Sequence, residues 1–122
     1  CMGQQILIVD DSGSIRQSMK YVLEAAGYSV LEAANGKEAL GVVQPQTKLV
    51  VTDINMPEMN GIELIKSIRA GSPPLKTVPI IILTTESQDD MKQKGKEAGA
   101  TAWIVKPFPP EAIISTIKKL IG

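Results

Sequence analysis

The stretch ILIVDD at residues 6–11 decides the fold class of this chain of 122 residues. Its four consecutive apolar residues, without polar alternation, are typical of a strand that is buried on both faces of a parallel sheet. Similar short apolar runs occur at residues 49–51, 80–83 and 103–105, and a weaker strand is expected at residues 29–33. The chain therefore contains five predicted strands, and acidic residues directly follow the first one.

Segments with helical periodicity separate these strands. Apolar residues recur at helical spacing in residues 15–26, 39–43, 62–68 and 113–121, so each segment has one apolar face. Residues 87–97 predict a further helix, although its apolar content is low. Strands that alternate with helices predict an α/β fold with an open, doubly wound, five-stranded parallel sheet and helices on both of its faces.

Capping residues predict where several helices begin. Such a residue, with a polar partner three positions later, is expected at Ser14 with Gln17, Asn60 with Glu63, and Ser87 with Asp90. Gly27 is expected to end the first helix. Gly95 lies inside the helix predicted for residues 87–97, where it costs about 1 kcal/mol relative to alanine. We therefore expect this helix to be the most mobile one.

Composition argues against several classes of protein. The 13 basic and 13 acidic residues cancel, so a nucleic-acid partner is not expected. No apolar run approaches the roughly 18 residues of a membrane-spanning helix, so no membrane partner is expected either. Histidine is absent, which removes Ser-His, Cys-His and His-metal chemistry. The single cysteine, Cys1, precedes Met2 and is interpreted as a remnant of cloning or processing, and a reducing compartment, the cytoplasm, is expected.

Polar residues gather directly behind the predicted strands. Asp10 and Asp11 follow the first strand, Asp53 the third, Thr84 the fourth and Lys106 the fifth. The carboxyl ends of parallel strands meet at one edge of the sheet, where ligands bind. Carboxylates about 4 Å apart repel by roughly 4 kcal/mol per pair at an effective dielectric of 20, so three of them need a cation, and oxygen ligands favour Mg²⁺. A carboxylate beside Mg²⁺, with a hydroxyl and a lysine, is a complete set for making an aspartyl phosphate.

Four motifs at these positions resemble the receiver domain of two-component response regulators, in particular the single-domain chemotaxis type (CheY-like). They are ILIVDD at 6–11, DINMPEMNG at 53–61, IIILT at 80–84 and AGATAWIVKPF at 98–108. The resemblance extends from Ile6 to Leu120 and implies a single receiver domain over residues 1–122. It also implies the flavodoxin-like, CheY-like fold, with its strands in the order 2-1-3-4-5.

The resemblance implies a role for each matching residue at the acidic edge. Asp53 corresponds to the phosphoacceptor. Asp10 and Asp11 correspond to the metal-binding acids, with Asp11 favoured as a direct ligand. Asp53 and the backbone carbonyl of Asn55 complete the protein's share of a Mg²⁺ site. Lys106 corresponds to the lysine that holds a phosphoryl oxygen.

Two further residues, Thr84 and Trp103, correspond to switching positions of the family, and Pro107 corresponds to a structural one. Thr84 matches the switch hydroxyl, and the bond between Lys106 and Pro107 is expected to be cis. Trp103 stands where the family usually has Tyr or Phe, and its larger indole carries an N–H that needs a partner when buried. Two interpretations of Trp103 stay open. Either it packs on the last helix, partly exposed, or it switches with Thr84 or anchors a partner.

The resemblance also implies partners. A CheA-like histidine kinase would phosphorylate Asp53, and a downstream protein such as a flagellar motor switch component would bind the face of the fourth helix, fifth strand and fifth helix. We expect a monomer that is not an enzyme, apart from self-catalysed phosphoryl transfer to Asp53 and hydrolysis from it.

Two alternatives remain beside this interpretation. In the first alternative, the chain is a phosphorelay intermediate or the isolated receiver of a larger regulator. Its last helix, however, lacks the Arg that is usual in DNA-binding regulators. A more remote alternative is a phosphatase of the haloacid dehalogenase type. That family usually has a second acid two residues after the nucleophile, where this chain has Asn55, which cannot exchange protons.

Overall fold

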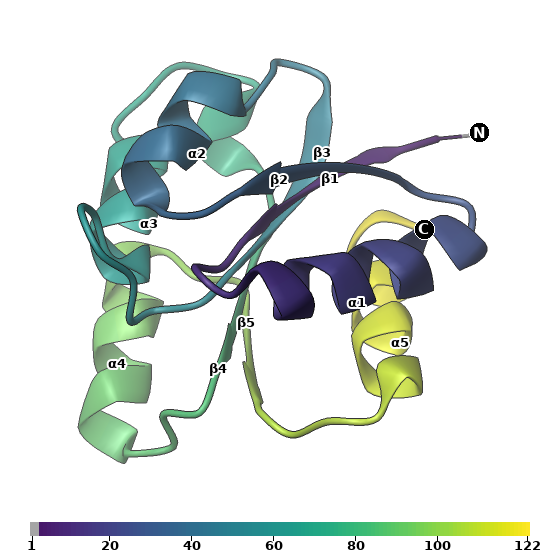
Figure 1. The fold of residues 1–122 in the computed structure, drawn as a ribbon. Coiled ribbons are helices and arrows are strands. Elements are labelled where there is room, and N and C mark those ends of the chain that lie inside the picture. Colours follow the sequence, from purple (N-terminus) through teal and green to yellow (C-terminus); the bar gives the residue numbers. More distant parts are fainter. Residues whose placement is uncertain (1–2) are drawn as a thin grey trace.

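The computed structural model describes residues 3–122, which form one parallel sheet with helices on both faces (Figure 1). The strand order is β2-β1-β3-β4-β5, so the predicted fold class and strand order are confirmed. Cys1 lies outside the described residues. The strands are β1 (Gln5–Val9), β2 (Ser29–Ala33), β3 (Thr47–Thr52), β4 (Ile80–Thr84) and β5 (Ala102–Val105).

The helices form a layer on each side of the sheet. α1 and α5 cover one face, whereas α2, α3 and α4 cover the other (Figure 1). Within residues 3–122, none of the helices is both long and apolar enough to cross a lipid bilayer. The helices are α1 (Gly13–Ala25), α2 (Gly36–Val42), α3 (Gly61–Arg69), α4 (Asp89–Ala98) and α5 (Pro110–Ile121), and a 3-10 helix spans Leu75–Thr77.

Two apolar cores, one on each face of the sheet, hold these layers together. Side chains alternate between the faces along a strand. Leu7 and Val9 of β1 therefore join the core under α2, α3 and α4, while Ile6 and Ile8 join the core under α1 and α5. All four are 2% exposed or less, and burying each one stabilises the fold by roughly 1.5–3 kcal/mol. The carboxyl end of β1, where the acids begin, is thus held rigidly.

The start of α1 differs from the prediction. The N-cap is Ser12, whose hydroxyl accepts the N–H of Ile15 at 3.3 Å, whereas Ser14 lies inside the helix. The physical reason is a contact at the end of β1. The carboxylate of Asp10 accepts the N–H of Ser12 at 2.9 Å, so the chain turns at once and the helix begins at Gly13.

The other predicted helix ends show one further difference. Asn60 and Glu63 form the expected capping box at α3, and Gly27, with a φ of +97°, comes directly after Ala26, the C-cap of α1. The cap expected at Ser87 is wrong, because α4 begins at Asp89 after Gln88, which makes no side-chain capping hydrogen bond. The preceding loop is held at Glu86 instead, as described below.

Candidate functional site

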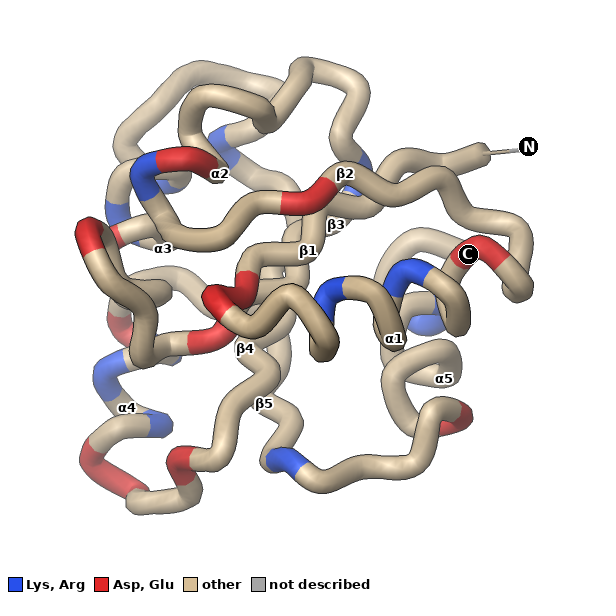
Figure 2. The backbone as a smooth tube through the Cα atoms, viewed as in Figure 1, with Lys and Arg blue, Asp and Glu red and all other residues tan. Residues whose placement is uncertain are grey.

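Three acids from two neighbouring strands meet at the carboxyl edge of the sheet. Asp10 and Asp11 follow β1, and Asp53 follows β3, which pairs with β1. One carboxylate oxygen from each residue lies within 4.8 Å of the other two. Figure 2 shows acidic positions gathered where β1 leads into α1. The structure therefore brings together the three carboxylates that the sequence placed behind two different strands.

Lys106 lies between two of these acids. Its Nζ is 2.9 Å from Oδ2 of Asp10 and 3.1 Å from Oδ2 of Asp53. The second oxygen of each carboxylate accepts a backbone N–H, that of Ser12 at 2.9 Å and that of Ile54 at 2.7 Å. One oxygen of each acid is therefore held by the backbone, and the other faces the lysine.

The lysine and its two partners are largely shielded from water. The exposed fractions of the side chains are 13% for Lys106, 5% for Asp10 and 14% for Asp53. Burial of the ammonium opposes its charge. The hydrogen bonds to Asp10 and Asp53 and the charges of these two acids outweigh that effect, so the pKa of Lys106 is raised above its ordinary value of 10.5. The lysine is thus a permanent positive charge at neutral pH.

The backbone also fixes the position of Lys106. Its N–H donates to the carbonyl of Thr84 at 2.8 Å, which ties the end of β5 to the end of β4. The peptide bond between Lys106 and Pro107 is cis, as the resemblance implies.

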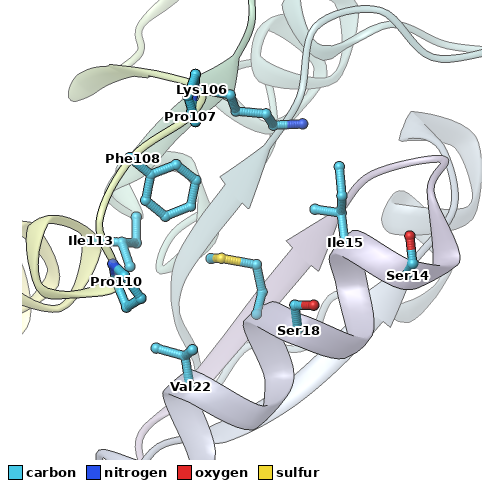
Figure 3. A pocket seen from close by; sticks show the side chains of 10 residues that line it. Ser14, Ile15, Ser18, Val22, Lys106, Pro107, Phe108, Pro110 and Ile113 are labelled. Atoms are coloured by element: carbon cyan, nitrogen blue, oxygen red, sulfur yellow. The ribbon is translucent and has the colours of Figure 1, made fainter.

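A hollow of about 410 Å³ opens beside Lys106, between α1 and the segment that joins β5 to α5. Figure 3 shows Phe108 and Ile113 on one side of this hollow, and Ile15 and Ser18 of α1 on the other. Most of these walls are apolar, so they offer the ammonium few partners. The stem of Lys106 can therefore lie against apolar atoms while its Nζ reaches the carboxylates.

The donor set fits a divalent cation. Three carboxylates and one ammonium leave two negative charges, which a divalent ion balances. Asp11 is exposed, so its oxygens are accessible to an ion and its waters, while Asp10 and Asp53 are mostly covered. Mg²⁺ binds to a few carboxylate oxygens and keeps several water ligands, which suits a site that is open on one side.

Arg16 of α1 holds the backbone of Asp10, a role that sequence reasoning missed. Its Nη1 donates to the Asp10 carbonyl at 2.6 Å, and its Nε donates to the carboxylate of Glu32 at 3.3 Å. A signal was available, because a positive charge near the start of a helix is unfavourable against the helix dipole and needs a local partner. Asp10 is therefore oriented through both its side chain and its carbonyl.

Gly61 lets α3 begin directly against the phosphoacceptor candidate. A Cβ atom at Gly61 would collide with the backbone carbonyl oxygen of Asp53. The N–H of Gly61 also donates to the carbonyl of Ile54 at 2.9 Å. The missing side chain of Gly61 therefore allows the close approach of α3 to the backbone of Asp53.

Thr84 lies at the same edge but is engaged with its own loop. The residue is fully buried, and its hydroxyl accepts the N–H of Glu86 at 3.3 Å. The carboxylate of Glu86 in turn accepts from the side-chain amide of Asn55 at 3.4 Å. This contact joins the loop after β3 to the loop after β4, next to Asp53.

Trp103 packs against α4, and the expectation that it packs on the last helix is wrong. The register of β5 places Trp103 beside Ile82 of β4, and the indole belongs to the core under α2, α3 and α4. The expected partner for its N–H is present, since Nε1 donates to the carbonyl of Glu86 at 3.1 Å. Gly95 of α4 leaves room for the ring, because a Cβ atom at this position would lie only 2.8 Å from Cζ3 of Trp103.

Comparison with known proteins agrees with this geometry. Residues 6–118 match the response regulator receiver domain family. Chemotaxis protein CheY1 of Helicobacter pylori is 40% identical over 121 residues, which cover 97% of each chain. The phosphate regulon transcriptional regulatory protein PhoB of Pseudomonas aeruginosa is 37% identical over 98% of this chain and 52% of its own length. The solved structure of Vibrio cholerae chemotaxis protein CheY4 has a TM-score of 0.91 and 43% identity, covering 99% of this chain and 100% of that one.

Proposed function

The chain belongs to the response regulator receiver domain family, and from this membership we propose that it is a chemotaxis-type response regulator phosphorylated on Asp53. One observation carries the assignment of Asp53. Its Oδ2 lies 3.1 Å from Nζ of Lys106. The oxygens of an incoming phosphoryl group are negatively charged, and a positive charge at this position stabilises them. We take residues 1–122 to be one receiver domain.

The transfer step uses one oxygen of the Asp53 carboxylate as nucleophile. Oδ1 accepts the N–H of Ile54, whereas Oδ2 faces the ammonium of Lys106, where an incoming phosphoryl group would be stabilised, so we assign Oδ2 as the attacking atom. It bonds to the phosphorus of a phosphohistidine, the P–N bond breaks, and the imidazole keeps the electron pair and takes a proton from water. Later, a water oxygen attacks the phosphorus, the P–O bond to Asp53 breaks, and inorganic phosphate leaves. Both steps are self-catalysed within a signalling domain.

The residues that would hold Mg²⁺ are Asp10, Asp11, Asp53 and the backbone carbonyl of Asn55. When bound, the ion supplies positive charge to the phosphoryl oxygens. The clustering of the three carboxylate oxygens within 4.8 Å supports this assignment. Of the two acids after β1, the exposed Asp11 is favoured as a direct ligand, and Arg16 keeps the backbone of Asp10 in place.

Thr84, Lys106 and Trp103 form the switch. Lys106 contacts one phosphoryl oxygen, and the Thr84 hydroxyl leaves the N–H of Glu86 and donates to another. Since Nε1 of Trp103 holds the Glu86 carbonyl, movement of this loop reaches the indole. A local change of charge thereby biases a two-state element, the face formed by α4, β5 and α5.

The partners follow from the same proposal. A CheA-like histidine kinase donates the phosphoryl group, and a flagellar motor switch component binds the α4–β5–α5 face. A groove of about 300 Å³ on this face is lined in part by Lys92, Lys96 and Trp103, which offers a partner both charge and an aromatic edge. We propose a cytoplasmic monomer that has neither a nucleic-acid nor a membrane partner.

A second candidate is the receiver of a larger regulator or a phosphorelay intermediate. The similarity to PhoB favours this alternative, because this chain covers only 52% of PhoB, a longer transcriptional regulatory protein. The two candidates share Asp53 and Mg²⁺ and differ in the downstream partner. Beryllofluoride, which mimics the phosphoryl group, should strengthen binding to a flagellar motor switch component if the first candidate is correct, and no gain in affinity favours the second.

Labelling by acetyl phosphate tests the phosphoacceptor. We expect the wild-type protein to take up one phosphoryl group with Mg²⁺ and none with excess EDTA, as read by intact mass. Asp53→Asn should take up none. Asp89→Asn, an exposed acid at the start of α4, is the matched control and should label normally. Persistent labelling of Asp53→Asn would refute the assignment.

A further inference from the structure

Arg16 of α1 contacts the peptide group that joins the two acids at the end of β1. Its Nη1 donates to the carbonyl oxygen of Asp10 at 2.6 Å, and this carbonyl lies in the same planar peptide unit as the N–H of Asp11. A short hydrogen bond from an ionised donor is stronger than one between neutral groups. The guanidinium therefore fixes the orientation of the peptide plane from which Asp11 extends.

Asp11 depends on this peptide more than Asp10 does. The buried carboxylate of Asp10 accepts hydrogen bonds from the N–H of Ser12 and from Nζ of Lys106, both at 2.9 Å. The carboxylate of Asp11 is exposed and accepts no hydrogen bond within the part of the chain that the structure describes. One of its oxygens nevertheless lies within 4.8 Å of oxygens of the other two acids. Its place in the cluster therefore follows from the backbone that carries it.

The guanidinium of Arg16 is itself held by Glu32 of β2, the strand beside β1. Nε of Arg16 donates to Oε1 of Glu32 at 3.3 Å, and Nζ of Lys20 lies 3.9 Å from Oε2 of the same carboxylate. A guanidinium can bond to a carbonyl and a carboxylate at once, because its N–H groups point in fixed, different directions. The charge of Glu32 also offsets that of Arg16, which by itself would repel a nearby cation.

We propose, resting on the Mg²⁺ site proposed above, that Arg16 is a positioning residue that makes this site selective for Mg²⁺ over Ca²⁺. Mg²⁺ demands nearly ideal octahedral geometry with short bonds, whereas Ca²⁺ accepts longer bonds and variable geometry. A fixed peptide between Asp10 and Asp11 leaves the Asp11 carboxylate less freedom to adapt to the larger ion. Arg16 contributes no ligand atom and acts through the backbone.

The hydrogen bond is tested by NMR in the metal-free protein. The chemical shift of a carbonyl carbon responds to the hydrogen bonds that its oxygen accepts, so the Asp10 carbonyl signal should move in Arg16→Met. Lys20→Met is the matched control, because it removes an equal charge and another partner of Glu32 but leaves Arg16 in place. Its Asp10 signal should equal that of the wild type. An unchanged signal in Arg16→Met would overturn the proposal.

The selectivity is tested by titrating metal-free protein with MgCl2 or CaCl2 at constant ionic strength, followed by the amide NMR signals of Asp11 and Asp53. In Arg16→Met, Kd for Mg²⁺ should rise about tenfold, as for other residues that orient metal ligands, and Kd for Ca²⁺ by a smaller factor. Lys20→Met should bind Mg²⁺ at least as tightly as the wild type. Arg16→Lys keeps the charge but lacks the planar fork, so it should also weaken Mg²⁺ binding, and it serves if Arg16→Met does not fold.

The direction of the change decides the proposal. Loss of a positive charge by itself favours the binding of a cation, so weaker Mg²⁺ binding in Arg16→Met points to positioning rather than to charge. Equal or tighter Mg²⁺ binding, or equal losses for Mg²⁺ and Ca²⁺, would overturn the proposal, because general damage to the site does not discriminate between the ions. If the wild type binds no Mg²⁺, the proposed metal site fails too. If the wild type binds Mg²⁺ and the Arg16 variants keep its selectivity, only the role of Arg16 fails.

Discussion

Lys106 contacts both Asp10 and Asp53, so its removal leaves two carboxylates side by side without their counter-charge. In metal-free buffer, Lys106→Met should therefore lower the free energy of unfolding on the order of 1–3 kcal/mol at neutral pH. Urea unfolding followed by circular dichroism measures this difference. Lys94→Met, an exposed lysine of α4, is the control and should change little.

The same lysine predicts a specific pH dependence. Its pKa is raised in the folded state, so the folded chain holds this proton more tightly than the unfolded chain does. The stabilisation is then complete below the ordinary pKa of 10.5 and is lost as the pH rises through the higher folded value. The gap between wild type and Lys106→Met should therefore narrow above pH 10.5. A gap that stays constant across this range would contradict the prediction.

Individual site residues differ in how far the sequence could predict them. Asp10, Asp53 and Lys106 were predictable because each directly follows a strand, and parallel strands end at a common edge. The partners of Arg16 and Gly95 were not, since they lie on segments elsewhere along the chain, although the charge of Arg16 near a helix start indicated that it needs a partner. For the same reason, the sequence did not predict which helix Trp103 packs against, because this follows from the register of β5 and not from a local pattern.

Among the elements, α3 begins in close contact with the backbone of Asp53. Gly61→Ala should force the backbone of α3 or of Asp53 to shift, because the new Cβ collides with the Asp53 carbonyl oxygen. We expect a loss of about 1–3 kcal/mol, as for overpacked positions elsewhere, together with slower labelling by acetyl phosphate. Thermal unfolding measures the loss of stability, and intact mass measures the rate of labelling.

Gly41→Ala provides the comparison within a helix. A Cβ atom at Gly41 meets no neighbour, so the substitution should stabilise the protein by about 0.5–1 kcal/mol through helix propensity alone. If both glycine variants behave alike, the contact between Gly61 and Asp53 does not control the site.

Helix boundaries show where local pattern falls short. Ser12 and Ser14 are both suitable caps, and a hydrogen bond from the Ser12 N–H to Asp10 settles the choice. At α3, by contrast, Asn60 has a suitable partner in Glu63 and no competing cap nearby, so its capping box was predictable. Residues 87–97 are mostly polar, so the start of α4 had little apolar periodicity to define it.

For the whole molecule, the proposed metal site couples ion binding to folding. An ion that binds only the folded state stabilises it, by about 2.7 kcal/mol at a concentration of 100 times Kd. Mg²⁺ should therefore raise the melting temperature, and Asp11→Asn should reduce this gain. Melting curves with Mg²⁺, with EDTA and with NaCl of equal ionic strength separate specific binding from screening. A gain with NaCl that matches the gain with Mg²⁺ would argue against the site.

The overall architecture was largely predictable. Unbroken apolar runs indicated strands covered on both faces, and the alternating helices indicated parallel connections. The order of the strands was not predictable from these patterns. β1 lies between β2 and β3, and nothing in the apolar run of a strand specifies which strands it pairs with. Only the resemblance to a known family implied that order.

The ion pair between Asp10 and Lys106 spans 96 residues of the chain. During translation, the ribosome therefore releases the carboxylates long before the ammonium that accompanies them. A nascent polypeptide therefore carries these acids without their cationic partner until Lys106 has been added, and the proposed phosphoryl site is incomplete until then.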